Sequence, residues 1–244
     1  MCFLLLTIVI LAFSAFGCEN PLEIDRDTEI AIGREGALDL EAEYGFVNDP
    51  KMQQRIDAIG VRVAAVSQEP SLPWRFRILE SEEVNAVALP GGFIYIMRGM
   101  MDYVKNDDQL AGVIAHEIVH ADHHHAKNVI ERTMARALLA DLIFQKSSGS
   151  IRQAAGIALD LDMREGYREK EYEADGRGTE YAFRAGYRAQ GLRDLLKYLY
   201  EKEGDPERIT WLLQSHPPLS KRIERLDERI AQLTGVAPAD RYSG

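Results

Sequence analysis

The chain has 244 residues, of which 46% are apolar, and a formal net charge of −10 at pH 7. It is long enough to bury one substantial core, and we expect a single domain over residues 28–235 with a short tail over 236–244. The acidic balance excludes nucleic acid as an expected partner, because a phosphate backbone would be repelled over most of the exterior.

The chain opens on an uncharged segment, MCFLLLTIVILAFSAFG (residues 1–17), followed by Cys18. As a helix its apolar run would reach only about 20 Å, short of a hydrocarbon core of about 30 Å, which is typical of a signal peptide and not of a membrane span. Ala15-Phe16-Gly17-Cys18 resembles a bacterial lipobox. We therefore predict a periplasmic protein anchored to a bacterial membrane through a lipid on Cys18, with residues 18–27 as a tether.

Two alternatives to the lipid anchor stay open. Position 15 is Ala where a lipobox usually has Leu, and no Lys or Arg precedes the apolar run. A plain cleaved signal would give a soluble periplasmic protein, and an uncleaved signal would itself be the anchor.

The cysteine count limits the chemistry. Cys2 and Cys18 are the only cysteines, so a chain cleaved before Cys18 keeps one. This excludes a disulfide framework, a cysteine-ligated zinc site and a cysteine nucleophile in the folded body. Any metal ion must be held by histidine and carboxylate groups.

The first half of the folded chain is predicted to hold two helices and a small sheet. A helix is expected at about 28–44, where a glycine ends it, and a second at about 50–67 with proline in its first turn. Residues 74–79 (WRFRIL) alternate like a strand. The segment NAVALPGGFIYIM, residues 85–97, contains two short β-type runs broken by Pro-Gly-Gly.

The second half is predicted to contain helices and no strands. Asp107 and Asp108 offer an N-cap for the helix that carries the histidine-rich segment, and Ser220 offers a cap for the last helix. The predicted helices lie at about 108–125, 126–145, 151–163, 168–185, 192–203 and 221–233. We therefore expect an α+β fold, mostly helical with one small sheet.

The segment HEIVHADHHH (residues 116–125) holds five of the six histidines. On a helix, His116 and His120 project from the same face one turn apart and can bind one ion, while Glu117 lies about 100° round the axis. Zinc lowers the pKa of a bound water, and a carboxylate in reach can take its proton as the hydroxide attacks a carbonyl carbon. The motif thus predicts two metal ligands and a general base, Glu117.

A third ligand is needed beside the two histidines. A metzincin would place a third histidine at position 126, which is Ala, so that class is excluded. EKEYEAD (residues 169–175) offers Glu171 and Asp175, four apart on one helical face. We predict that Glu171 completes the metal site and that Asp175 accepts a hydrogen bond from the second nitrogen of His116. The alternative for this segment is a solvated acidic helix start.

The motifs NAVALPGGFIYI, HEIVHADHHH, EYEAD and SHPPLSKRIERL occur in this order, and the likeness spans residues 28–230. Together they resemble the HtpX-type family of zinc metallopeptidases, which includes the CAAX prenyl proteases and BepA-like periplasmic proteases. The resemblance implies a zincin-like (gluzincin) fold with the small sheet beside the HEIVH helix. It also implies endopeptidase activity and one zinc ion per chain, at His116, His120 and Glu171.

The resemblance assigns further roles. Asn85 and Ala86 match residues that line the cleft and bind an extended peptide by strand addition; for Asn85 the alternative is a buried structural turn. His216 matches a histidine near the metal, which either stabilises the oxyanion or binds zinc as a fourth ligand. Arg222 matches an arginine placed for the same oxyanion, and its alternative is an ion pair on the helix surface.

The remaining histidines have weaker assignments. His125 matches a family position and is expected to be structural at the end of the helix. His123 and His124 are surplus to the zinc site, or form an adventitious second metal site.

The leading function is a zinc endopeptidase that hydrolyses unfolded or misassembled envelope proteins, bound in extended form. Substrate selection would come from the cleft, an oligomer or the membrane tether. The first alternative is a latent or non-proteolytic, zinc-stabilised chaperone or assembly factor whose cleft is blocked by His216 or by the helices of residues 126–165. A metallohydrolase acting on something other than peptides is the second.

Overall fold

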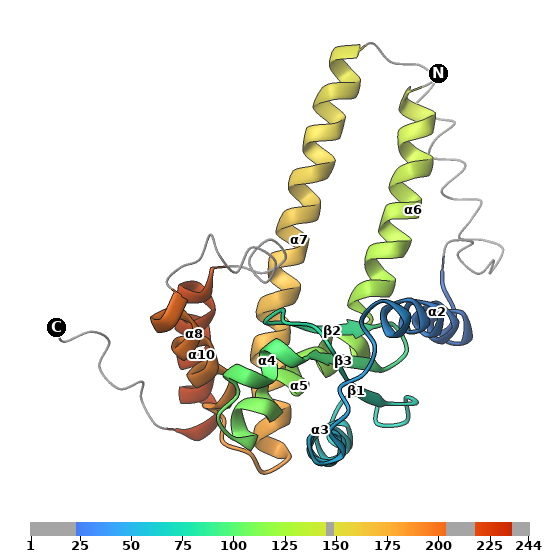
Figure 1. Ribbon diagram of the computed structural model, residues 1–244. Coiled ribbons are helices and arrows are strands. Elements are labelled where there is room, and N and C mark those ends of the chain that lie inside the picture. Colours follow the sequence, from blue (N-terminus) through green and yellow to red (C-terminus); the bar gives the residue numbers. More distant parts are fainter. Residues whose placement is uncertain (1–22, 145–148, 204–217, 236–244) are drawn as a thin grey trace.

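The computed structural model describes residues 23–144, 149–203 and 218–235 (Figure 1). Helices predominate, beside one small sheet, which confirms the predicted α+β class. The helices are α2 (Arg26–Tyr44), α3 (Pro50–Ala64), α4 (Arg98–Tyr103), α5 (Asp107–Asp122), α6 (His125–Phe144), α7 (Gly149–Arg184), α8 (Gly191–Glu203) and α10 (Leu219–Thr234). The strands are β1 (Arg75–Leu79), β2 (Ala86–Leu89) and β3 (Phe93–Met97).

The sheet has the strand order β1-β3-β2, with β1 parallel and β2 antiparallel to the central β3. Every residue of β3 is buried. The β2–β3 hairpin turns through Gly91 and Gly92, whose φ angles of 78° and 93° favour glycine. Within the described ranges β2 pairs with a strand on one side only, and the backbone of its Ala88 hydrogen-bonds to Glu117 of α5.

The helix α5 lies at the centre of the domain and packs against α3, α7, α8 and the sheet. It begins after Asn106, whose side chain accepts a hydrogen bond from Gln109 N. The predicted caps, Asp107 and Asp108, occupy the first turn instead, where the positive end of the helix dipole favours acidic groups.

Several predicted boundaries were wrong. Residues 149–184 form one helix of 36 residues, where two separate helices were expected. The stretch between them contains a single glycine, Gly166, which costs about 1 kcal/mol relative to alanine and does not end a helix. The last helix begins at Leu219 after Pro218 and has no side-chain cap, so Ser220 does not cap it. The short helix α4 was not predicted.

Figure 1 shows α6 and the first part of α7 projecting away from the sheet and α5. This arrangement does not favour the interpretation that the helices of residues 126–165 cover the HEIVH helix. None of the helices in the described ranges combines the length and apolarity that a membrane-spanning helix requires.

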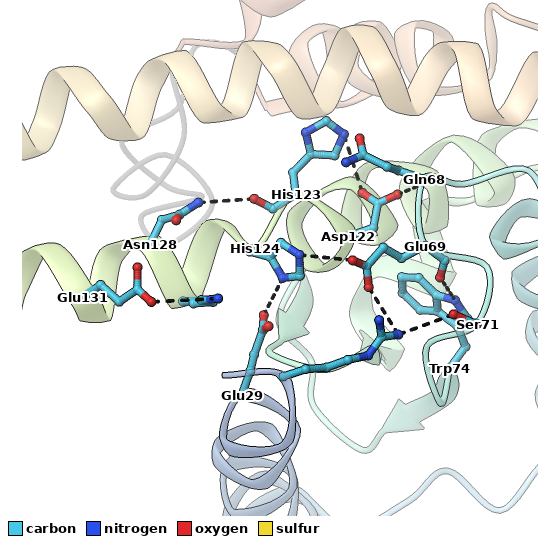
Figure 2. A network of polar contacts seen from close by, with 12 residues as sticks. Glu29, Gln68, Glu69, Ser71, Trp74, Asp122, His123, His124, Asn128 and Glu131 are labelled. Atoms are coloured by element: carbon cyan, nitrogen blue, oxygen red, sulfur yellow. Dashed lines mark hydrogen bonds and ion pairs between the residues drawn. The ribbon is translucent and has the colours of Figure 1, made fainter. Parts of the chain in front are cut away.

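A network of polar contacts holds α2 against the rest of the domain (Figure 2). Its buried Glu29 lies 2.9 Å from Nδ1 of His124, and Nε2 of His124 lies 3.3 Å from Glu69. Arg26 pairs with the same Glu69 at 3.4 Å. His124 has a φ of 54°, which turns the chain between α5 and α6 and aims the imidazole at these carboxylates. His124 therefore has a structural role that the sequence did not reveal.

The helix α7 packs closely on α5 at the histidine motif. A Cβ atom at Gly178 of α7 would lie 2.9 Å from His116 N and 3.0 Å from Ala115 C, both backbone atoms of α5. Glycine is needed here because these atoms cannot move aside without shifting the helix.

We predict that Gly178→Ala lowers the free energy of unfolding by about 1–3 kcal/mol, because the added methyl group forces α7 away from α5. Gly176→Ala is the matched control, since its Cβ would meet nothing within 4 Å. That variant should be unchanged or stabilised by up to about 1 kcal/mol. Urea unfolding measures both, and equal effects would contradict the packing argument.

Candidate metal centre

Two histidines of α5 and one glutamate of α7 converge in a buried pocket. Nε2 of His116 and Nε2 of His120 lie 3.2 Å apart. Glu171 Oε2 is 3.4 Å from the first nitrogen, and Oε1 is 3.3 Å from the second. One ligand atom from each residue lies within 4.8 Å of the others. Two imidazole nitrogens and a carboxylate are a ligand set that zinc accepts, so these residues fit the ion.

The electrostatics of this pocket favour positive charge. Burial alone would lower the pKa of His116, but the carboxylates of Asp175 and Glu171 raise it to about 10. A proton and a metal ion compete for the same imidazole nitrogens. The buried carboxylates therefore attract a cation to the point where the two rings meet.

Glu117 is buried next to the candidate metal ligands, with 6% of its surface exposed. Burial raises the pKa of its carboxyl to about 7, against the lowering effects of His116, Arg222 and a hydrogen bond with the Ala88 backbone. A carboxyl with a pKa near 7 can both take and release a proton at neutral pH.

Asp175 joins His116 to the last helix. Its Oδ1 lies 3.0 Å from Nδ1 of His116. Arg222 of α10 donates Nε–H to Oδ2 at 2.8 Å and a second N–H to Oδ1 at 2.7 Å. Burial would raise the pKa of Asp175, but Arg222 and His116 lower it to about 2. Asp175 is therefore ionised at neutral pH and faces the nitrogen that the sequence predicted.

The sequence did not predict the partner of Arg222. The buried residues of α10 are Leu219, Arg222, Leu226 and Ile230. An arginine within this apolar stripe is the signal that indicates a buried partner, which replaces the surface ion pair considered as an alternative. Its predicted role at an oxyanion stays a prediction.

A cavity of about 30 Å³ lies beside Glu117 and His116. Ala86 of β2 and Arg222 line it together with apolar side chains of α4, α5 and α8: Met100, Val113, Leu192, Leu195, Leu196 and Leu199. The structure thus brings Ala86, Arg222 and Glu117 to one cavity.

Asn85 is 1% exposed and precedes β2. Its backbone oxygen accepts a hydrogen bond from Met97 N at 2.9 Å. In the described part of the chain, neither side-chain nitrogen nor oxygen of Asn85 has a hydrogen-bond partner. A buried amide without a partner costs about 1–3 kcal/mol and calls for an explanation.

Of the other predicted site residues, Cys18 and His216 are outside the described residues. A second group of possible metal ligands contains His123, His125 and Glu173, with ligand atoms within 4.8 Å. His124 is not in this group, because its ring faces Glu29 and Glu69.

Residues 50–230 match peptidase family M48. The chain belongs to this family. The M48 match covers both histidines of the HEIVH motif, Glu171, Asp175 and Arg222, and it confirms the family that the sequence motifs predicted. Membership supports the prediction of a zinc metalloprotease.

Relatives of this M48 chain carry protease names. It is 26% identical to the beta-barrel assembly-enhancing protease of Escherichia coli K12 over 84% of the chain and 44% of that protein. It is 25% identical to the metalloprotease YcaL of the same organism, over 93% of the chain and 97% of that protein. Mitochondrial metalloendopeptidase OMA1 of Schizosaccharomyces pombe is 25% identical over 84% of the chain and 62% of that protein. The chain thus spans less than half the length of the first relative.

We predict that Arg222→Met lowers the free energy of unfolding by about 3–5 kcal/mol, because it leaves the Asp175 carboxylate buried without its cation. Urea unfolding measures the change. Combining Arg222→Met with Asp175→Asn should recover part of the loss.

The matched control is Arg229→Met. Arg229 of α10 also pairs with α7, at 2.6 Å from Glu180, but both side chains are about one-third exposed. Removing this pair should cost at most about 1 kcal/mol. Equal losses in the two variants would show that the burial of the Asp175 pair is not decisive.

Proposed function

We propose that this chain is a zinc-dependent endopeptidase. The observation that carries the proposal is the convergence of His116, His120 and Glu171 within 4.8 Å of one another in a buried pocket. The carboxylate of Glu117 adjoins this pocket, and the family of the chain is one of peptidases.

His116, His120 and Glu171 hold one zinc ion in this proposal. When bound, zinc lowers the pKa of water towards neutrality and polarises a carbonyl group. Glu117 acts as the general base that takes the proton of the attacking water and then delivers it to the leaving amine. Asp175 keeps the His116 ring in orientation through Nδ1. Arg222 keeps Asp175 ionised and, from the wall of the cavity, stabilises the developing oxyanion.

The substrate is a polypeptide bound in extended form. The edge of β2 that pairs with no other strand in the described part of the chain can pair with an added strand, and the buried amide of Asn85 can hydrogen-bond to the peptide. The leucine-lined cavity beside Glu117, of about 30 Å³, suits a small apolar group next to the scissile bond. Unfolded proteins offer both an extended backbone and uncovered apolar side chains, which supports them as the substrate class.

The proposed site of action is the periplasm, with the protein anchored through a lipid on Cys18. The lipobox-like sequence before Cys18 supports this anchor. The name of the beta-barrel assembly-enhancing protease of Escherichia coli supports unfolded or misassembled envelope proteins as substrates.

Replacement of Glu117 by Gln should lower the rate of cleavage of unfolded casein by about 10²–10⁴-fold, because the variant cannot take the proton of water. Zinc content, measured on the same samples, should be unchanged. Glu35→Gln, at an exposed position of α2, is the control and should retain full activity. A chelator should abolish cleavage by the wild type, and added zinc should restore it. Full activity of the Glu117 variant would exclude the proposed base.

Cys18→Ser should move the protein from the membrane fraction to the soluble fraction, because the hydroxyl cannot accept the lipid. Cys2→Ser serves as the control, since Cys2 lies inside the predicted signal peptide and should leave the anchor intact. Fractionation and mass measurement of the mature N-terminus give the result. A Cys18 variant that stays in the membrane fraction would point to an uncleaved anchor.

A further inference from the structure

His125, the first residue of α6, contacts the metal-binding His120 directly. Its ring is buried, and its Nδ1 lies 3.0 Å from Nδ1 of His120. Its other nitrogen, Nε2, lies 3.5 Å from Glu173 Oε2. Lys170 of α7 donates a hydrogen bond to the backbone oxygen of His125 at 3.0 Å. Glu173 and Lys170 of α7 thus hold His125 against the Nδ1 side of the His120 ring, away from His116 and Glu171.

The positions of the protons follow from the contacts of His120. Its Nε2 faces Glu171 and His116, which is the side where the proposed zinc binds. A neutral imidazole that binds a metal through Nε2 carries its proton on Nδ1. The Nδ1–H of His120 therefore needs an acceptor, and Nδ1 of His125 lies at hydrogen-bonding distance. Since this nitrogen accepts, the proton of His125 is on Nε2, which faces Glu173.

We propose that His125 is a positioning residue that accepts the Nδ1–H of His120, and that Glu173 fixes the tautomer of His125. The inference rests on the proposed zinc site. His125 does for His120 what Asp175 does for His116, so each of the two metal-binding rings has its own acceptor. Such outer partners fix the orientation of a ligand histidine and increase its basicity.

The same residues could be interpreted as a second metal site, formed by His123, His125 and Glu173. An ion bound to Nε2 of His125 would place the proton of that ring on Nδ1, where it would face the Nδ1–H of His120 at 3.0 Å. Two donors would then oppose each other. In addition, Arg177 donates to Glu173 Oε1 at 2.9 Å and occupies one of the oxygens that an ion would need. The contacts therefore favour one metal ion, at His116, His120 and Glu171, with His125 as the hydrogen-bond acceptor of His120.

The test is the dissociation constant for zinc, measured by competition with a chromogenic chelator on the full chain. His125→Leu should bind zinc about 10–100-fold more weakly, because His120 loses its acceptor. His125→Asn should bind within about threefold of the wild type, because Oδ1 of asparagine takes the place of Nδ1 and accepts the same hydrogen bond. His123→Leu is the matched control: it removes a neighbouring ring that contacts Glu173, and it should leave the affinity and the single equivalent of zinc unchanged.

Wild-type zinc affinity in His125→Leu would overturn the proposal, as would an asparagine variant as weak as the leucine variant. Two equivalents of zinc in the wild type and one in His123→Leu would establish the second metal site instead.

Nitrogen NMR of the zinc-loaded wild type gives a readout that does not depend on the folding of any variant. It should find the proton of His125 on Nε2, and a proton on Nδ1 would contradict the proposed hydrogen bond from His120 to His125. Because these readouts are binding and tautomer, a protein that binds zinc but cleaves no substrate would refute the proposed function and leave this test intact.

Discussion

The close packing of α7 on α5 is the constraint on which the metal centre depends. His116 and His120 are one turn apart on α5, and Glu171 and Asp175 are one turn apart on α7. Glycine at 178 lets the two backbones approach closely enough for these two pairs of side chains to meet. Glu171 then lies against Nε2 of both imidazoles, while Asp175 reaches Nδ1 of His116. A small increase in helix separation would weaken all of these contacts together.

The pairing of Arg222 with Asp175 offsets part of the cost of burying the charged groups of this site. Glu117, Glu171 and Asp175 are all buried, and an isolated buried carboxylate is costly. Arg222 is the compensating cation; it is buried as well and forms two parallel hydrogen bonds with Asp175. The carboxylate of Asp175 raises the pKa of Arg222 above its ordinary value against the effect of burial. The centre is thus a set of linked charges from three helices.

The parts of the site that could be predicted from the sequence are those set by spacing within one helix. Residues four apart share a face, so the pairs 116 with 120 and 171 with 175 follow from helix geometry. Which side chains of different helices meet depends on how the helices are placed, and spacing does not give this. The meeting of Glu171 and Asp175 with the histidines of α5 was predicted from the need for a third metal ligand instead. The contacts of Arg222 with Asp175, of His124 with Glu29 and of His125 with His120 depend on helix placement too, and none was predicted. The continuous α7 was not predicted, although the stretch between its two expected parts contains only one glycine, Gly166, which weakens a helix and does not end it.

The place of Arg222 in the chain has a consequence for the order in which the protein matures. Both helices that carry the proposed zinc ligands leave the ribosome before the last helix, and Arg222 lies 47 residues beyond Asp175. A nascent chain that lacks α10 therefore has the histidines and carboxylates without the guanidinium that pairs with Asp175. The charged groups of this site therefore cannot reach their final arrangement until the helix that carries Arg222 has been synthesised and has packed against α7.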